Sequence, residues 1–241
     1  MAASGTGAAS GAAAASGAAA ASGAAAAATA APAASGAPAA GGAAAKPAAS
    51  AAPKLVSVQM PAPPEDVPVT LKAASTAFVI NDVSEQTCKP QAVCTGQMVP
   101  KIAAFLTKAR AAGVYVVYTT PPTGSPPLPE VAPAAGDPIV KGDGQDRFYN
   151  TNLDSLLKAK NISNVILAGW RIDGSVIYTA VGATLRGYTV VVPDDTTSAA
   201  TDYDIAIGKY QLLTQLNNNA ANEPLKPKAV TISRTDLITL Q

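Results

Sequence analysis

Two polar side chains, Asp82 and Ser175, follow apolar segments at points where parallel sheets place catalytic groups. Residues 165–169 form an apolar run that ends in a short polar turn, and helical spacing of apolar residues resumes after Ser175. A strand, a tight turn and a helix lift the turn side chain above the sheet and direct free N–H groups toward it. Asp82 ends a second apolar run, residues 76–81. Ligands bind at the carboxyl ends of such strands, so one shared site is predicted.

Both side chains also have a purely structural interpretation. An aspartate after a strand commonly caps a helix or stabilises a turn. A serine early in a helix commonly hydrogen-bonds backbone groups. As a nucleophile, Ser175 needs a strong positioned base, because a hydroxyl is much less acidic than a thiol. In that role, backbone N–H groups near Gly174 and Ser175 would form an oxyanion site.

The patterning around these residues predicts strands that alternate with helices. The strands are expected at 76–82, 114–118, 165–168, 188–192 and 230–232, and the helices at 99–112, 152–160, 174–186 and 199–216. The proline- and glycine-rich segment 120–138 is predicted to be an irregular loop. Continuously apolar strands alternating with helices indicate a mostly parallel sheet covered on both faces, a three-layer αβα sandwich of Rossmann-like type.

Composition excludes several classes of site. The chain has no histidine, which removes Ser-His-Asp and Cys-His chemistry and histidine-ligated zinc. We therefore expect no metal and no cofactor. The net charge of +1 provides no electrostatic basis for binding nucleic acid or an anionic membrane. No apolar run is long enough to span a bilayer.

The first 53 residues differ in composition from the rest of the chain. They are rich in Ala, Gly, Ser and Pro, and a Ser-Gly pair recurs at Ser10, Ser16 and Ser22. Such a segment has almost no apolar surface to bury, so residues 1–53 are predicted to be disordered and residues 54–241 to form one domain. No basic and apolar signal peptide is visible, and both a cytoplasmic and an exported or periplasmic location stay open.

Four segments, in order, resemble the isochorismatase-like (cysteine hydrolase) superfamily over most of residues 68–199. They are Thr76–Asp82, Lys101–Thr119, Lys141 with Phe148–Leu153, and the stretch from the Gly169–Ser175 turn to Asp195. The resemblance implies that Asp82 is the catalytic aspartate and Lys141 the catalytic lysine. Ser175 stands where the family pattern Gly-Val-x-Thr-Asp-x-Cys-Val has its nucleophilic cysteine. It also implies a cis peptide near Trp170, before the turn.

The resemblance predicts a hydrolase that acts on a small carbonyl, amide or vinyl-ether substrate. Vinyl-ether hydrolysis depends on protonation, for which the nucleophile position need not hold cysteine. The alternative is a non-catalytic small-molecule binding or interaction domain that has lost the cysteine. Members of the family commonly assemble, so a homo-oligomer is expected.

The remaining candidates surround the same turn or follow Asp82. Trp170 is predicted to wall a substrate pocket or to pack in the core. Arg171 is predicted to bind a substrate carboxylate in a bidentate manner or to face solvent, and Gly174 to contribute to substrate binding. Cys88 and Cys94 are interpreted as a disulfide in an oxidising compartment, with two free thiols as the alternative.

Overall fold

The computed structural model describes residues 56–57, 59–215 and 218–241 of the chain. The prediction of a disordered segment over residues 1–53 lies outside these residues. Residues 57–241 form one compact unit, and the elements below belong to it.

A parallel sheet forms the centre of this unit. Its strands are β2 Thr76–Asn81, β3 Tyr115–Thr120, β4 Ile139–Lys141, β5 Asn164–Trp170, β6 Thr189–Pro193, β7 Thr197–Ser198 and β8 Val230–Ser233. The strand order is β4-β3-β2-β5-β6-β8, with β7 paired to the carboxyl end of β5, and every pair is parallel. A separate parallel pair joins β1 Val69–Leu71 to β9 Ile238–Leu240.

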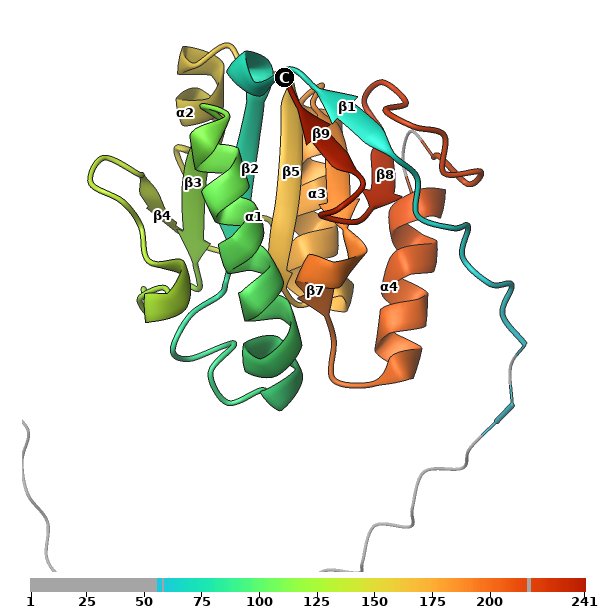
Figure 1. Cartoon of the computed structure of the whole chain (residues 1–241). Helices are drawn as coiled ribbons and strands as arrows, with labels where there is room; N and C mark the ends of the chain where they lie inside the picture. The colour runs from blue at the N-terminus through green and yellow to red at the C-terminus, as the bar shows by residue number, and fades with distance from the viewer. Residues whose placement is uncertain (1–55, 58, 216–217) are drawn as a thin grey trace, which may run out of the picture. The chain divides into compact units, whose positions relative to one another are not determined.

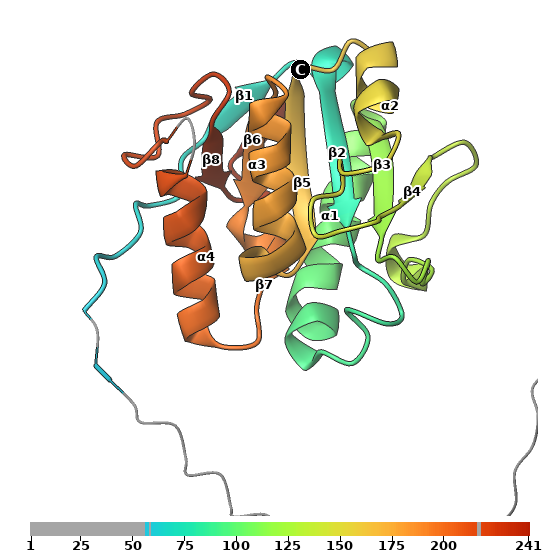
Figure 2. The same cartoon turned by 180° about the vertical axis from the view of Figure 1, so that it is seen from behind.

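Helices cover both faces of the sheet, as Figures 1 and 2 show. Their bounds are α1 Val99–Ala111, α2 Leu153–Ala159, α3 Ile177–Leu185 and α4 Asp202–Thr214. Helix α1 packs on one face, whereas α2, α3 and α4 pack on the other. This arrangement confirms the predicted αβα sandwich.

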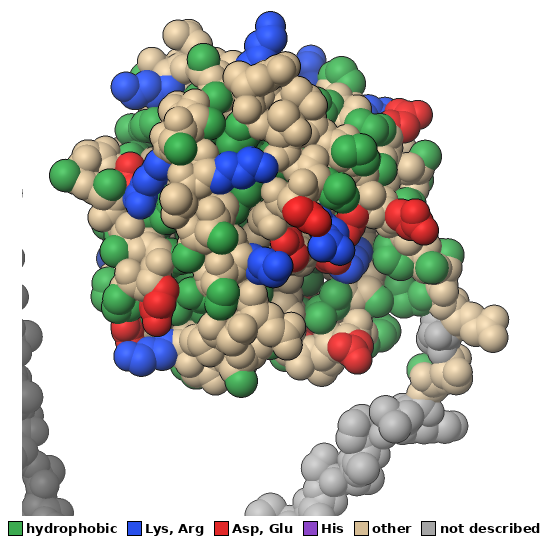
Figure 3. Space-filling model, in the orientation of Figure 1, with side chains coloured by type: hydrophobic (Ala, Val, Ile, Leu, Met, Phe, Trp, Pro, Cys, Tyr) green, Lys and Arg blue, Asp and Glu red, His purple; other side chains and the backbone are tan. Residues whose placement is uncertain are grey.

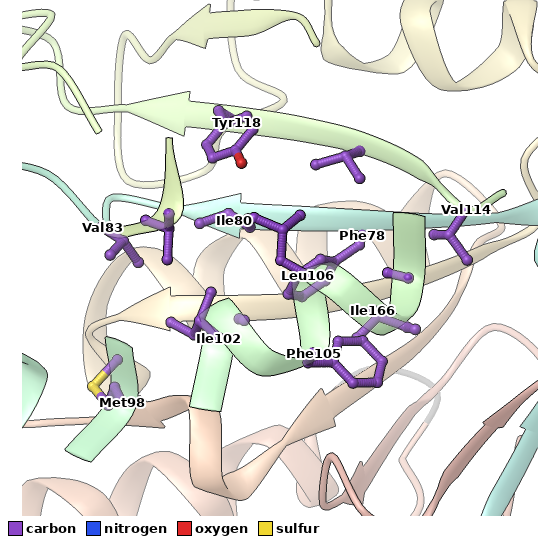
Figure 4. Close-up of a cluster of buried hydrophobic side chains, with 14 of the residues drawn as sticks. Phe78, Ile80, Val83, Met98, Ile102, Phe105, Leu106, Val114, Tyr118 and Ile166 are labelled. Atoms are coloured by element: carbon purple, nitrogen blue, oxygen red, sulfur yellow. The ribbon is translucent and has the colours of Figure 1, made fainter. Parts of the chain in front are cut away.

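Alternating side chains of the strands supply the two cores. Phe78 and Ile80 of β2 point toward α1, where Phe78 meets Phe105 edge-on with ring centroids 5.1 Å apart (Figure 4). Ala77 and Val79 point to the opposite face. Because both faces are buried, the strand sequence is apolar throughout rather than alternating.

The shortest strands are the ones that sequence patterning did not predict. Strands β1, β4, β7 and β9 have two or three residues each, too few to show a period. The predicted helix 174–186 also differs: residues 172–176 form a turn in which Gly174 has φ −131° and ψ −119°, and α3 begins at Ile177.

Charged side chains are interspersed by sign on the face seen in Figure 3, and they form no large area of one sign. Among the described residues, no helix combines the length and the apolar character needed to cross a bilayer.

Candidate active site

The carboxyl ends of three neighbouring strands align in one row. Asn81 of β2 is in register with Thr119 of β3 and Gly169 of β5. The Thr119 hydroxyl donates to Asn81 Oδ1 at 2.5 Å, and Asn81 Nδ2 donates to Ser175 Oγ at 2.9 Å. Ser175 Oγ in turn donates to the Trp170 carbonyl oxygen at 2.9 Å. This buried chain of hydrogen bonds fixes the position of the Ser175 hydroxyl.

Gly169 allows the turn that carries Ser175 to approach the end of β2. Its φ is 139°, and an added Cβ would lie 1.8 Å from the Asn81 carbonyl oxygen. Only glycine has room at this position. The Trp170–Arg171 peptide bond that follows is cis, as the family resemblance implies.

Asp82 lies beside Ser175 and is 3% exposed. Its φ of 57° turns the chain away from the sheet, and its N–H donates to the Thr119 carbonyl oxygen at 3.1 Å. The Thr87 hydroxyl donates to the Asp82 carbonyl oxygen. Oδ2 of the carboxylate accepts from Arg147 Nη2, whereas Oδ1 has no hydrogen-bond partner among the described residues.

Arg147 is the cation that pairs with Asp82, and it is 4% exposed. Its Nη2 pairs with Asp82 and its Nη1 donates to the Gly144 carbonyl oxygen. Its backbone N–H donates to Thr179 Oγ1 on α3 at 3.1 Å. Gly142 makes room for the guanidinium, because a Cβ there would lie 2.3 Å from Arg147 Nη1.

Burial raises the pKa of the Asp82 carboxyl above its ordinary value of 3.8, while the Arg147 guanidinium opposes this shift. Burial disfavours the charged form, and a cation or a hydrogen-bond donor favours it. Asp82 therefore has a raised pKa and lines the same pocket as Ser175.

The structure does not bring Lys141 into this site. Lys141 is the exposed last residue of β4, and its methylene groups lie beside Gly124. Strand β4 alternates between exposed and buried side chains, which turns Lys141 outward. The loop after β4 then returns to the sheet and places Arg147 against Asp82.

A pocket of about 670 Å³ opens over Asp82 and Ser175. Its lining includes the predicted residues Trp170, Arg171 and Gly174, and it also includes Thr87, Pro121, Pro122, Gln145, Arg147, Asp173 and Tyr178.

The backbone N–H groups of Gly174 and Val176 both donate to the Arg171 carbonyl oxygen. The Gly174 N–H, one of the expected oxyanion donors, is therefore already engaged, whereas no such bond occupies the Ser175 N–H among the described contacts. The described part of the chain gathers no three acidic or cysteine side chains that could hold a metal.

Sequence reasoning missed Asn81 and Arg147. Asn81 carried a usable signal, because a buried amide in the last position of an apolar strand needs hydrogen-bond partners. Arg147 lies in a polar loop where nothing in the local pattern distinguishes it from a surface cation. Only its neighbours in space identify it.

A disulfide links Cys88 to Cys94, whose Cα atoms are 5.4 Å apart. The disulfide cross-links the segment between β2 and α1. Thr87 of this segment lines the pocket, and its hydroxyl donates to the Asp82 carbonyl oxygen. Disulfides persist in oxidising compartments.

Reduction of this disulfide is expected to lower the free energy of unfolding by about 2 kcal/mol, because the unfolded chain regains the entropy of a short loop. Urea denaturation with and without reductant measures the change. The variant Cys88→Ser/Cys94→Ser provides the control, since its stability should not respond to reductant. Two freely alkylated cysteines in oxidised, unreduced protein would contradict the bond.

Comparison with protein families gives one domain match for this chain. The family described as Isochorismatase domain matches residues 76–218, which contain Asp82, Arg147 and Ser175. Two curated proteins are also similar to this chain. The ureidoacrylate amidohydrolase RutB of Stutzerimonas stutzeri is 25% identical over 65% of this chain and 83% of its own length. The secreted isochorismatase effector Isc1 of Verticillium dahliae is 31% identical over 44% and 60%, respectively.

Solved structures have the same fold. N-carbamoylsarcosine amidase from Thermoplasma acidophilum aligns with a TM-score of 0.55 and 25% identity, over 67% of this chain and 97% of that chain. An isochorismatase family protein from Burkholderia thailandensis aligns with a TM-score of 0.59 and 19% identity, over 72% and 97%.

Proposed function

Because the chain belongs to the isochorismatase family, we propose that its domain hydrolyses a small amide-type substrate. Asp82 transfers the hydroxyl proton of Ser175 to the leaving nitrogen, and the Ser175 hydroxyl oxygen attacks the substrate carbonyl carbon. Two similar proteins that cleave amide bonds, the ureidoacrylate amidohydrolase and the N-carbamoylsarcosine amidase, support this substrate class.

The observation that carries the proposal is that Oδ1 of Asp82 has no hydrogen-bond partner among the described residues. This oxygen belongs to a buried carboxylate that lines the pocket beside Ser175. A buried carboxylate oxygen without a hydrogen bond is unfavourable, and such atoms are rare in folded proteins. Such an oxygen is expected where the carboxylate must accept a proton during a reaction, because a permanent hydrogen bond would block that proton transfer.

In this reaction a single proton passes from Ser175 through Asp82 to the leaving nitrogen. Ser175 Oγ bonds to the carbonyl carbon while its proton passes to Asp82 Oδ1. The same proton then passes to the leaving nitrogen as the C–N bond breaks, and water hydrolyses the resulting ester. At rest the hydroxyl donates to the Trp170 carbonyl oxygen, so it must first rotate about the Cβ–Oγ bond toward Asp82.

A second candidate is cleavage of a vinyl ether by protonation. The raised pKa of Asp82 and the engagement of Ser175 by Asn81 and Trp170 favour it. In this route protonated Asp82 donates to the double-bond carbon, and water adds to the adjacent carbon. The product then breaks down to a ketone and an alcohol, with no covalent role for Ser175.

Ser175→Cys is expected to raise amide hydrolysis at least about tenfold, because a thiol of pKa near 8.5 loses its proton to Asp82 far more readily than a hydroxyl. Ser175→Ala is expected to abolish amide hydrolysis and to spare vinyl-ether hydrolysis. Steady-state kinetics on small amides and on an uncharged vinyl ether measure both. Inert wild type and inert Ser175→Cys would instead support the non-catalytic binding domain.

The control for the introduced thiol is Ser163→Cys, an exposed position before β5. Since Cys88 and Cys94 are disulfide-bonded, iodoacetamide labels only the introduced thiol in unreduced protein. Faster alkylation at position 175 than at position 163 near neutral pH would show that the site activates a thiol.

We also propose that the domain forms a homo-oligomer. The apolar side chains Tyr178 and Leu185 of α3 are exposed by 55% and 61%, and a second copy would cover them. Light scattering coupled to size-exclusion chromatography tests this assembly.

A further inference from the structure

We propose that Asp173 sets substrate specificity: its carboxylate occupies Arg171, so the pocket selects uncharged amides over amides that bear a carboxylate. This inference rests on the proposed function. Arg171 Nε donates to Asp173 Oδ1 at 2.6 Å, and Nη2 pairs with Asp173 Oδ2. Both side chains line the pocket that contains Ser175.

Asp173 occupies the Nε–Nη2 face of Arg171, one of the two faces with which a guanidinium binds a carboxylate in a bidentate manner. Asp173 is only two residues away in the same turn, so its carboxylate is held at a high effective concentration. Asp204 of α4 lies 3.5 Å from Nη2 of the same guanidinium. A substrate carboxylate must therefore displace Asp173 from the Nε–Nη2 face or bind at the Nη1–Nη2 face beside the like charge of Asp204.

The other two charged side chains of the pocket also pair with each other, through Arg147 Nη2 and Asp82 Oδ2. The charged residues that line the pocket are Asp82, Arg147, Arg171 and Asp173, and they form two ion pairs. The pocket therefore has no net charge to attract an anion. Its uncharged walls include Trp170, Pro121 and Pro122, which suit an uncharged organic body.

Succinamide and succinamate form a matched pair of probes, since they differ only in one amide against one carboxylate. The wild type is expected to hydrolyse succinamide at least about tenfold more efficiently, as judged by kcat/KM for ammonia release. In Asp173→Asn/Asp204→Asn the ratio should shift at least about tenfold toward succinamate, the effect of one charge-assisted hydrogen-bond pair. Asp173→Asn alone should give an intermediate ratio.

The control variant Asp202→Asn/Asp236→Asn removes the same amount of negative charge at exposed positions outside the pocket. Its ratio should equal that of the wild type. An equal shift in the control would show that net charge, rather than the freed Arg171, causes the effect.

A readout without catalysis separates this inference from the proposed function. Trp170 is the single tryptophan of the chain and lines the pocket, so its fluorescence reports which solutes enter. Iodide should quench Trp170 at least about twofold more strongly in Asp173→Asn/Asp204→Asn than in the wild type or the control. Quenching by uncharged acrylamide should not change.

If neither succinamide nor succinamate is hydrolysed, the proposed function fails and quenching alone decides the inference. Wild-type preference for succinamate, or iodide quenching that is unaltered in a double variant with native circular dichroism, would overturn it. If the double variant does not fold, Asp173→Asn alone must still move both readouts in the stated direction.

Discussion

Asp82→Asn is expected to lower kcat by about three orders of magnitude, within the range of 10²–10⁴ typical for loss of a general acid or base. Asparagine keeps the size of the side chain and tolerates the φ of 57° at this position, so the backbone should be retained. It cannot accept a proton from Ser175 or donate one to a vinyl ether. Steady-state kinetics with the best substrate measures the loss.

Asp143→Asn serves as the control, because this exposed acid lies outside the pocket and bonds only to Asn150 among the described residues. Its kcat should match the wild type. Thermal unfolding of both variants must show folded protein, since Asp82→Asn leaves the buried Arg147 without its counter-charge. Near-wild-type turnover by folded Asp82→Asn would contradict the assignment of the proton to Asp82.

The pH dependence of kcat/KM distinguishes the two routes. Amide cleavage requires ionised Asp82, so activity falls as the pH drops through the pKa of Asp82. Vinyl-ether cleavage requires protonated Asp82, so activity falls as the pH rises through the same pKa. Because burial raises the pKa of Asp82, either transition should lie above 3.8 and should be absent in Asp82→Asn.

Gly169→Ala is expected to lower the free energy of unfolding by about 2–5 kcal/mol, from about 1–3 for overpacking and about 1–2 for the backbone conformation. Its Cβ would lie 1.8 Å from the Asn81 carbonyl oxygen, an atom of the neighbouring strand that has no free space to move into. Urea denaturation measures this change. Catalysis should fall as well, because Asn81 holds Ser175.

Gly187→Ala isolates the backbone contribution. Gly187 has φ +95°, but an added Cβ meets nothing within 4 Å. This variant should therefore lose only about 1–2 kcal/mol. A Gly169→Ala protein as stable as Gly187→Ala would show that β5 and β2 do not approach each other as closely as described.

The sequence by itself determined the layered fold and the shared position of Asp82 and Ser175. Both follow from local rules: long apolar runs must be buried on both faces, and residues after parallel strands meet at one edge. Short strands such as β4 were not predictable, since three residues at the edge of a sheet gain their stability from the neighbouring strand rather than from their own pattern.

Tertiary structure determined which cation pairs with Asp82. Lys141 and Arg147 occupy the same polar stretch, and the family resemblance implied the lysine. The path of the loop depends on contacts with distant residues, above all the Thr179 hydroxyl that accepts from the Arg147 N–H and the space left by Gly142. These contacts turn Lys141 outward and bring Arg147 to Asp82.

The partner of Arg171 was likewise decided only in three dimensions. The sequence showed an arginine in the turn, which suits either a substrate carboxylate or solvent. The turn at Gly174 and the packing of α4 instead place Asp173 and Asp204 on its guanidinium. Which groups lie at the carboxyl edge of a sheet is a local property of the chain, whereas which charges pair there depends on how distant loops and helices pack.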